Sequence, residues 1–338
     1  MQSFGVKYRP TQFDTVVGQE SVVKILKQQL LTKSFKNAYI FSGASGSGKT
    51  TCARIFANEI NNHQGNPIEI DAASNNGVDN VRQISDSASA RALDSEYKIY
   101  IIDECHVLTN QAWNAFLKTI EETPKYTIFI FCTTDPQKIP DTIKNRCMRF
   151  NFTRIPAYQI KSRLEYVCQQ EGFTNYLDAC DYISRICKGE MRNALSLLET
   201  CADYSTDFSI DNVVKAIGNF SYDTYFKLIN AIIDGDITQS FDIIANIYNN
   251  GNDLLYFIVS FLDFVLDVAK YTLCQDINIT KLPQSEIEHL KFTTSINDAS
   301  KYFLYITDKL LELKNMLKND TDVKSTIEVM FTQMCRLL

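Results

Sequence analysis

A glycine-rich stretch of the chain has the spacing of a phosphate-binding loop. The residues from Gly43 to Thr50 fit the pattern G-x-x-x-x-G-K-[ST], between an apolar run that ends at Phe41 and a helix-like run, Thr51–Ile60. Glycines let the backbone turn around phosphate oxygens, and the N–H groups of the loop and of the following helix attract negative charge. We therefore expect this stretch to bind the phosphates of ATP through Gly43, Ala44, Ser45, Gly46, Ser47, Gly48, Lys49, Thr50 and Thr51.

Two side chains of this loop indicate hydrolysis with magnesium. Lys49 supplies positive charge to the β- and γ-phosphates, and the Thr50 hydroxyl is a ligand of Mg²⁺. The apolar run Lys98–Ile102 leads directly into Asp103 and Glu104, and open α/β sheets present ligand groups at the carboxyl ends of their strands. Asp103 can hold the magnesium while Glu104 activates the attacking water, so we expect an ATPase with Glu104 as its base.

Weaker signals follow two later segments. The apolar run Phe129–Cys132 ends in Thr133 and Thr134, whose hydroxyls could orient the water or contact the γ-phosphate. Arg146 comes shortly after the last of the apolar runs. A threonine pair after a strand is most often an ordinary turn, and a single arginine is most often solvated. The residues alone therefore leave both roles open.

Short apolar runs alternate with amphipathic segments up to about residue 155, which is typical of an α/β domain. We expect strands at Ala38–Phe41, Ile68–Ile70, Ile99–Ile102 and Ile128–Cys132, the last two of them buried and parallel. Between these two lies a predicted helix, Gln111–Glu122. Its apolar residues recur on one face, which indicates core packing rather than a cofactor site, and they are Trp113, Phe116, Leu117 and Ile120.

Helical periodicity replaces the strand signals from about residue 156 to the end of the chain. We place an α/β domain at 1–155 and two all-α domains at 156–218 and 219–338. The apolar stretch Leu254–Val268 is too short to span a bilayer and carries two aspartates, so it reads as a buried helix. A sustained apolar face near the C-terminus suits packing within or between subunits, and it consists of Phe303, Ile306, Leu310, Leu313 and Leu317.

The composition excludes several classes of protein. The 338 residues are 45% hydrophobic and 22% charged, as in globular domains, and the net charge of −6 argues against a chain that grips nucleic acid alone by a large basic face. The ten cysteines are scattered without a C-x-x-C pair, which indicates reduced thiols in cores rather than a metal site. The first residues lack the apolar core of a secretory signal, so we expect a cytoplasmic protein without a membrane span.

Several motifs resemble those of the gamma/tau subunits of bacterial DNA polymerase III, which are AAA+ P-loop ATPases, and they follow one another in the same order and with similar spacing. The resemblance extends over about residues 1–218, and the helical remainder is compatible with the collar domain of that family. Beside the glycine-rich loop, the motifs that carry it are Tyr8–Pro10, Phe13–Glu20, Ile70–Ser74, Asp103–His106, Leu117–Pro124, Thr133–Pro140 and Asn145–Cys147.

This resemblance implies an AAA+ domain with a five-stranded parallel sheet, a small helical lid domain and a C-terminal helical collar domain. Five subunits would assemble through their collars, with ATP between neighbours, to open a sliding clamp and load it onto primer-template DNA during replication. The implied partners are the clamp, other clamp-loader subunits, primed DNA and, as a further candidate, the polymerase. The implied location is the bacterial cytosol, or the host cytoplasm for a virus-encoded loader.

The resemblance also assigns roles to individual residues. Arg146 becomes the arginine finger that reaches the ATP of the adjacent subunit, and Arg192 becomes the second sensor arginine, contributed by the lid. Either Thr133 or Thr134 becomes the first sensor, and the sequence does not choose between them. The residues that correspond to the segment over the adenine are Tyr8, Arg9, Val17 and Gly18.

The chain departs from the family pattern at several places. The family usually carries a four-cysteine zinc module before the Ile70 strand, but here Asn61–Pro67 joins helix and strand directly, so we expect no zinc. Asn145, Cys105 and Asn193 stand where a serine, an aliphatic residue and an aspartate are usual. All of the core catalytic groups remain, so hydrolysis is still expected, while its rate stays open.

Contacts with DNA and clamp are the least specific expectations from the resemblance. DNA contacts are expected at helix N-termini near Ser74–Val78 and Thr109–Asn110, because backbone amides can meet phosphate without much basic charge. The Ser87–Leu93 neighbourhood is the expected clamp contact. Ordinary loop and cap residues are the alternative for each segment.

Two other functions would share part of this pattern. A different AAA+ enzyme, such as a branch-migration motor or a protein remodeller, would share the P-loop and the Asp103–Glu104 pair. It would be expected to form hexamers and to lack the segment that begins at Thr133. A scaffold subunit of the same loader that does not hydrolyse ATP would be expected to have a damaged P-loop, whereas the loop of this chain is intact.

Overall fold

The computed structural model of the chain describes residues 2–218, 220–276, 279–280, 282, 286, 290, 299–317 and 322–337. The chain divides into two compact units. One consists of Met1–Val167 with Cys187–Glu199, and the other of Cys168–Ile186 with Thr200–Leu338. Helices α7 (Ala157–Glu171) and α9 (Met191–Tyr204) contribute residues to both.

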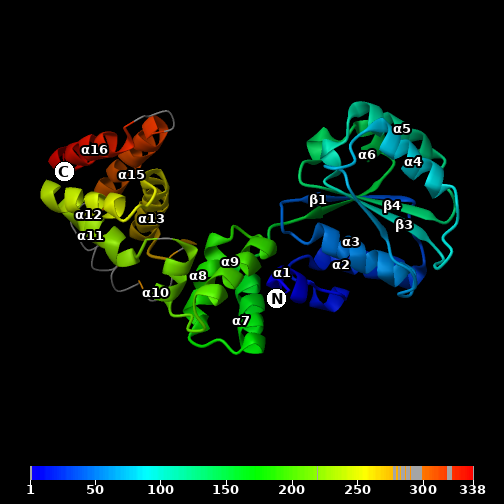
Figure 1. The fold of residues 1–338 in the computed structure, drawn as a ribbon, viewed down its shortest axis with the longest axis horizontal. Coiled ribbons are helices and arrows are strands. Elements are labelled where there is room, and N and C mark those ends of the chain that lie inside the picture. The colour runs from blue at the N-terminus through cyan, green and yellow to red at the C-terminus, as the bar shows by residue number, and fades with distance from the viewer. Residues whose placement is uncertain are drawn as a thin grey trace. The chain divides into compact units, whose positions relative to one another are not determined.

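A parallel sheet of five strands forms the centre of the first unit (Figure 1). The strands follow the order β2-β3-β4-β1-β5, and every neighbouring pair is parallel. The four strands expected from the sequence are all present, each slightly longer than expected, and the edge strand β5 is the one that no sequence pattern located. The strands are β1 (Ala38–Gly43), β2 (Ile68–Asp71), β3 (Lys98–Asp103), β4 (Thr127–Thr133) and β5 (Met148–Phe152).

Helices cover both faces of this sheet, with α2 and α3 on one face and α4, α5 and α6 on the other (Figure 1). Three short 3-10 helices lie between these elements: η1 (Phe13–Thr15), η2 (Cys105–Val107) and η3 (Pro136–Lys138). The α-helices are α1 (Phe4–Lys7), α2 (Glu20–Thr32), α3 (Lys49–Ile60), α4 (Val78–Ala88), α5 (Asn110–Glu121) and α6 (Asp141–Lys144).

The side chains of β1 alternate between two buried clusters. Tyr39 and Phe41 pack with α2 and α3, whereas Ile40 packs with α4, α5 and α6. Burial on both faces is the reason why these strands are continuous apolar runs in the sequence. The predicted apolar stripe of α5 lies in the second cluster, where Trp113 and Phe116 are almost completely buried. The α/β class expected for this part of the chain is confirmed.

The second unit is helical in the part of the chain that the structure describes, apart from one isolated bridge between Thr174 and Asp207. The predicted buried helix at Leu254–Val268 is confirmed as part of α13, and the apolar face near the C-terminus is buried within a single large core. Besides segments of α7 and α9, the helices are α8 (Tyr176–Ile186), α10 (Ile210–Ile217), α11 (Tyr222–Ile233), α12 (Ile237–Asn249), α13 (Leu254–Cys274), α15 (Ala299–Met316) and α16 (Val323–Leu337).

Candidate nucleotide-binding site

The glycine-rich loop connects the end of β1 to the start of α3, as expected. Three of its glycines have positive φ angles: 151° at Gly43, 63° at Gly46 and 97° at Gly48. A Cβ atom at Gly43 would lie 2.2 Å from the backbone oxygen of Phe152 in the neighbouring strand β5. Only glycine fits there, because backbone atoms cannot move aside as a flexible side chain can.

Gly43→Ala is therefore expected to destabilise the folded chain by about 2 to 3 kcal/mol, because it combines a clash with an unfavourable φ angle. The matched control is Gly77→Ala, where φ is negative and a Cβ atom would meet nothing within 4 Å. Chemical denaturation of both variants measures the difference. Equal midpoints for the two variants would contradict the close approach of β1 and β5 at this point.

The side chains that follow the loop lie among polar partners at the carboxyl edge of the sheet. The ammonium group of Lys49 donates to the backbone oxygens of Gly43 and Ala44, both at 2.9 Å. The Thr50 hydroxyl donates to Asp103 Oδ2 at 2.9 Å. A hydroxyl and a carboxylate oxygen in contact are the hard oxygen ligands that Mg²⁺ prefers, so the pair fits that ion.

Burial lowers the pKa of the Lys49 ammonium group below its ordinary value, and the negative charge of Glu104 is the largest influence in the opposite direction. The groups in direct contact with this buried cation are two carbonyl oxygens, which carry only partial charges. A phosphate group of a bound nucleotide would supply a full negative charge at contact distance. The site is therefore suited to an anion that Lys49 can reach.

Glu104 lies directly after β3, in the left-handed backbone conformation with φ 47°. Its carboxylate oxygen Oε2 accepts a hydrogen bond from the Thr134 hydroxyl at 3.1 Å and lies 3.2 Å from His106 Nδ1. Thr133 is completely buried, and its hydroxyl oxygen accepts from the backbone N–H of Asp135 at 3.0 Å. Of the two threonines expected to sense the nucleotide, Thr134 is thus the one in direct contact with Glu104.

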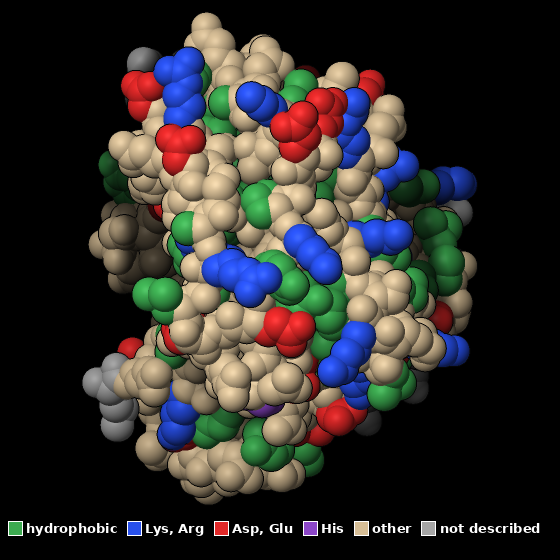
Figure 2. Space-filling view, turned by 90° about the vertical axis from the view of Figure 1, so that its right-hand side faces the viewer, with side chains coloured by type: hydrophobic (Ala, Val, Ile, Leu, Met, Phe, Trp, Pro, Cys, Tyr) green, Lys and Arg blue, Asp and Glu red, His purple; other side chains and the backbone are tan. Residues whose placement is uncertain are grey.

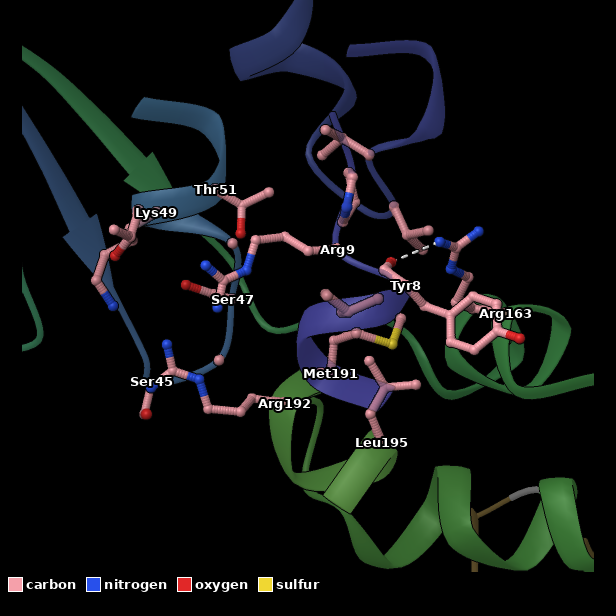
Figure 3. Close-up of a pocket in the computed structure, with 18 of the residues that line it drawn as sticks. Tyr8, Arg9, Ser45, Ser47, Lys49, Thr51, Arg163, Met191, Arg192 and Leu195 are labelled. Carbon is pink, nitrogen blue, oxygen red and sulfur yellow. Dashed lines mark hydrogen bonds between the residues drawn. The ribbon is translucent and has the colours of Figure 1, made fainter. Parts of the chain in front are cut away.

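The pocket continues away from the P-loop between the N-terminal segment and two helices (Figure 3). Tyr8 and Arg9 lie on the N-terminal side, and Met191 and Leu195 of α9 lie opposite. The Arg163 guanidinium group of α7 donates to the backbone oxygen of Tyr8 at 2.8 Å, shown as the dashed line in Figure 3. This apolar and aromatic end of the pocket is suited to the base of a nucleotide.

Arg192 reaches the same pocket from the first turn of α9 (Figure 3). The backbone N–H of Met191 donates to the oxygen of Gly46 at 3.2 Å. A Cβ atom at Gly46 would lie 3.3 Å from Arg192 Cβ. The start of α9 therefore contacts the P-loop directly. Arg192 lies where its positive charge would interact with a bound phosphate.

Gln19 is a residue of the site to which the sequence patterns assign no role. Its side chain is only 4% exposed and donates to the backbone oxygens of Ser47 and Thr153, at 3.1 and 2.8 Å. Its amide oxygen accepts from the backbone N–H of Thr153 at 3.2 Å. Gln19 thus ties the N-terminal segment to the P-loop and to the residue after β5. The only signal for it is its place beside Gly18 in the motif Phe13–Glu20.

Most residues expected to bind nucleotide or metal line one pocket. Those that line it are Tyr8, Arg9, Val17, Ser45, Gly46, Ser47, Gly48, Lys49, Thr50, Thr51, Asp103, Glu104 and Arg192. The same pocket is also lined by residues that no pattern indicated, among them Gly5, Pro10, Val16, Ile155, Arg163, Met191 and Leu195.

The other expected site residues lie around this pocket or apart from it. Gly43 and Ala44 contact Lys49, as described above, and Gly18 packs closely against Ile155. Arg146 does not line the pocket. Its guanidinium group contacts Glu121 Oε1 at 2.6 Å and donates to the backbone oxygen of Thr142 at 2.8 Å.

Two further observations concern metals and membranes. Among the described residues, no group of three or more histidine, cysteine or acidic side chains could hold a metal ion. Eight of the ten cysteines are buried, while Cys147 is half-buried and Cys274 is exposed. Within the same described ranges, every helix is too short or too polar to cross a bilayer.

Sequence comparison relates the chain to replication proteins. It is 34% identical to DNA polymerase III subunit gamma/tau of Mycoplasma genitalium over 315 residues, which cover 86% of this chain and 53% of that protein. It is 36% identical to DNA polymerase III subunit tau of Bacillus subtilis over 286 residues, which cover 78% of this chain and 51% of that protein. The chain thus spans about half the length of these curated relatives.

Two other comparisons concern the family and the fold. The family described as "DNA polymerase III, delta subunit" matches residues 68–156. The RuvB Holliday junction branch migration motor of Thermotoga maritima is similar in structure, with a TM-score of 0.54 and 19% identity over 67% of this chain and 80% of that one. The likeness to RuvB shows that the two chains share a fold, and the fold class expected from the sequence is confirmed.

Proposed function

Because this chain belongs to the family of DNA polymerase III gamma/tau subunits, we propose that it is an ATP-hydrolysing motor subunit of a DNA sliding-clamp loader. The observation that carries the proposal is the single pocket that brings the intact P-loop together with Asp103, Glu104 and Arg192. An intact set of hydrolytic groups, in a relative of replication subunits, favours a motor that opens the clamp and loads it onto primed DNA.

The residues of the pocket would divide the work of binding ATP. The P-loop backbone and Lys49 would hold the phosphates, with Lys49 exchanging its carbonyl partners for phosphate oxygens. Thr50 and Asp103 would hold Mg²⁺. When bound with ATP, Mg²⁺ supplies positive charge to the β- and γ-phosphate oxygens. The adenine base of ATP would lie at the apolar end of the pocket, beside Tyr8 and Val17.

Hydrolysis requires a group that orients and activates water opposite the leaving phosphate. Glu104 is one residue beyond the proposed metal ligand Asp103, and its carboxylate is therefore available for this task. Thr134, which contacts this carboxylate, is the better candidate for the first sensor. Arg192 would report the presence of phosphates to α9, since it extends from the first turn of that helix.

Arg146 would act in the site of a neighbouring subunit. It is absent from the lining of its own pocket, and its side chain is 41% exposed. An exposed arginine held by a surface carboxylate can reach a partner's phosphates without a large cost. We propose that five subunits assemble in this way, through a C-terminal collar, and that three domains at 1–155, 156–218 and 219–338 carry motor, lid and collar.

Primer-template DNA would contact the motor through helix N-termini. The segments before α4 and α5 lie together, because the backbone N–H of Thr109 donates to the oxygen of Asn76 at 3.4 Å. The face drawn in Figure 2 shows lysine and arginine side chains interspersed with acidic ones rather than gathered in one basic field. Binding through backbone amides suits such a surface and the net charge of −6.

The sliding clamp would contact the segment Ser87–Leu93. Leu93 is fully exposed, and the Arg91 guanidinium carbon lies 4.0 Å from the centre of the Tyr126 ring. An exposed leucine beside an anchored arginine is a suitable contact for another protein. We place this activity in the cytoplasm, together with the other loader subunits and the polymerase.

The rival functions make different predictions. The likeness to a branch-migration motor is a likeness of fold, at 19% identity, whereas the polymerase subunits are 34% and 36% identical in sequence. A scaffold subunit without hydrolysis would not need Lys49, Thr50, Asp103 and Glu104 to line one pocket, as they do here. The motor subunit of a clamp loader is therefore the better proposal.

The test is the steady-state ATPase activity of the chain reconstituted with companion loader subunits from its source. Clamp and primer-template DNA together are expected to stimulate hydrolysis more than either one alone, and removal of Mg²⁺ by a chelator should abolish it. The control is duplex DNA without a primer end. Hydrolysis that is indifferent to clamp and primed DNA would favour another AAA+ motor, and an absence of hydrolysis would favour the scaffold.

A further inference from the structure

His106 contacts the carboxylate that the proposed mechanism uses on water. Its ring nitrogen Nδ1 lies 3.2 Å from Glu104 Oε2 and 3.3 Å from the Thr133 hydroxyl oxygen. The His106 side chain is 16% exposed, whereas that of Glu104 is 39% exposed. The imidazole ring is thus fixed inside the protein while the carboxylate that it touches faces the pocket.

The surroundings of His106 Nδ1 indicate where the imidazole proton lies. Nδ1 lies 3.2 Å from Glu104 Oε2 and 3.3 Å from the Thr133 hydroxyl oxygen, which also accepts from the backbone N–H of Asp135. An ionised carboxylate oxygen can only accept a hydrogen bond. The contact with Glu104 is therefore favourable when Nδ1 carries a proton that faces the carboxylate.

The two groups beside Glu104 Oε2 come from different elements. Thr134 follows directly after β4, whereas His106 belongs to η2 after β3. The Thr134 hydroxyl donates to Oε2 at 3.1 Å, and His106 Nδ1 lies 3.2 Å from the same oxygen. Two donors directed at one oxygen would fix the rotation of the carboxylate and direct its second oxygen, Oε1, elsewhere.

We propose that His106 is a positioning residue that holds Glu104 through Nδ1–H, so that the free carboxylate oxygen faces the attacking water. This inference rests on the proposed role of Glu104 in ATP hydrolysis. Thr133 supports the arrangement, because its hydroxyl oxygen lies 3.3 Å from Nδ1.

The test compares three substitutions in the full chain, assembled with its companion subunits. His106→Ala removes the donor and should lower kcat for ATP roughly tenfold, a part of what a general base contributes, with KM unchanged. His106→Asn places an amide N–H at the position of Nδ1 and should restore most of the loss. His106→Gln places its amide at the position of Nε2 and should not.

Glu104→Gln, alone and combined with His106→Ala, distinguishes the proposed role of Glu104 in hydrolysis from the proposed role of His106 in positioning it. If His106 acts through Glu104, the second substitution should add little to the loss caused by the first, because residues that act as a unit are not additive. Wild-type kcat in His106→Ala, beside a slow Glu104→Gln, would overturn the role of His106 alone. Wild-type kcat in Glu104→Gln would overturn the proposed role of Glu104, and the positioning role with it.

Discussion

Glu104→Gln should bind ATP and the sliding clamp as the wild-type chain does, yet hydrolyse ATP roughly 10²- to 10⁴-fold more slowly. The amide keeps the size of the side chain and can still accept from Thr134, but it cannot take a proton from water. Lys49, Thr50 and Asp103, which hold the phosphates and the metal in the proposed mechanism, are unchanged. Loader assemblies that contain this variant should therefore accumulate with clamp and primed DNA bound and with the clamp not released.

The measurement is a single-turnover experiment with labelled ATP, paired with equilibrium binding of a fluorescent ATP analogue. Glu96→Gln is the matched control, because Glu96 is an exposed carboxylate outside the pocket, and it should behave as the wild type. A Glu104→Gln variant that fails to bind ATP would count against the assignment. So would one that releases the clamp at the normal rate.

The fold could be predicted where local patterns decide it. Strands β1, β3 and β4 are buried on both faces, and this double burial produces the apolar runs that identify them. β5 lies at the edge of the sheet, and only Phe150 and Phe152 of its five residues are buried. Its exposed polar residues interrupt the apolar run, so the chain around Arg149 carries no comparable signal.

The candidate site, like the fold, could be predicted only where residues close together in the chain decide it. The P-loop and Asp103 follow directly from a strand and a short motif, because each depends on residues next to one another in the chain. Gln19 binds Thr153, and Arg163 binds Tyr8, across more than a hundred residues. Such pairs depend on how the elements pack, and a single sequence does not contain that information.

The contacts of His106 show the same limit at short range. Glu104 and His106 are only two residues apart, but they meet because Glu104 takes the left-handed conformation and η2 follows it. That backbone conformation is uncommon for a residue other than glycine, and residues held in it cluster at functional sites. The motif Asp103–His106 predicts the roles of the two carboxylates. The turn that brings the imidazole close to Glu104 is visible only in the structure.

The position of Arg146 supports the proposal that this residue acts in the site of a neighbouring subunit. Its partner Glu121 is 48% exposed, and a surface ion pair of this kind contributes about 0 to 1 kcal/mol. Replacing that carboxylate by a phosphate of a neighbouring subunit's ATP therefore costs little free energy. Since Arg146 does not line its own pocket, its removal should affect hydrolysis in the neighbour and leave ATP binding in its own subunit intact.

Arg146→Ala should thus bind ATP normally and lose stimulated hydrolysis by roughly 10³- to 10⁵-fold, the contribution typical of an arginine finger. Arg149→Ala is the matched control, because Arg149 is an exposed arginine three residues away on β5. The clamp- and DNA-stimulated ATPase of mixed assemblies should fall with the fraction of Arg146→Ala subunits, since each one disables a neighbouring site. Equal ATPase activity of the isolated monomer with and without Arg146 is expected on this basis. A loss in the monomer would instead place the arginine in its own site and contradict its action between subunits.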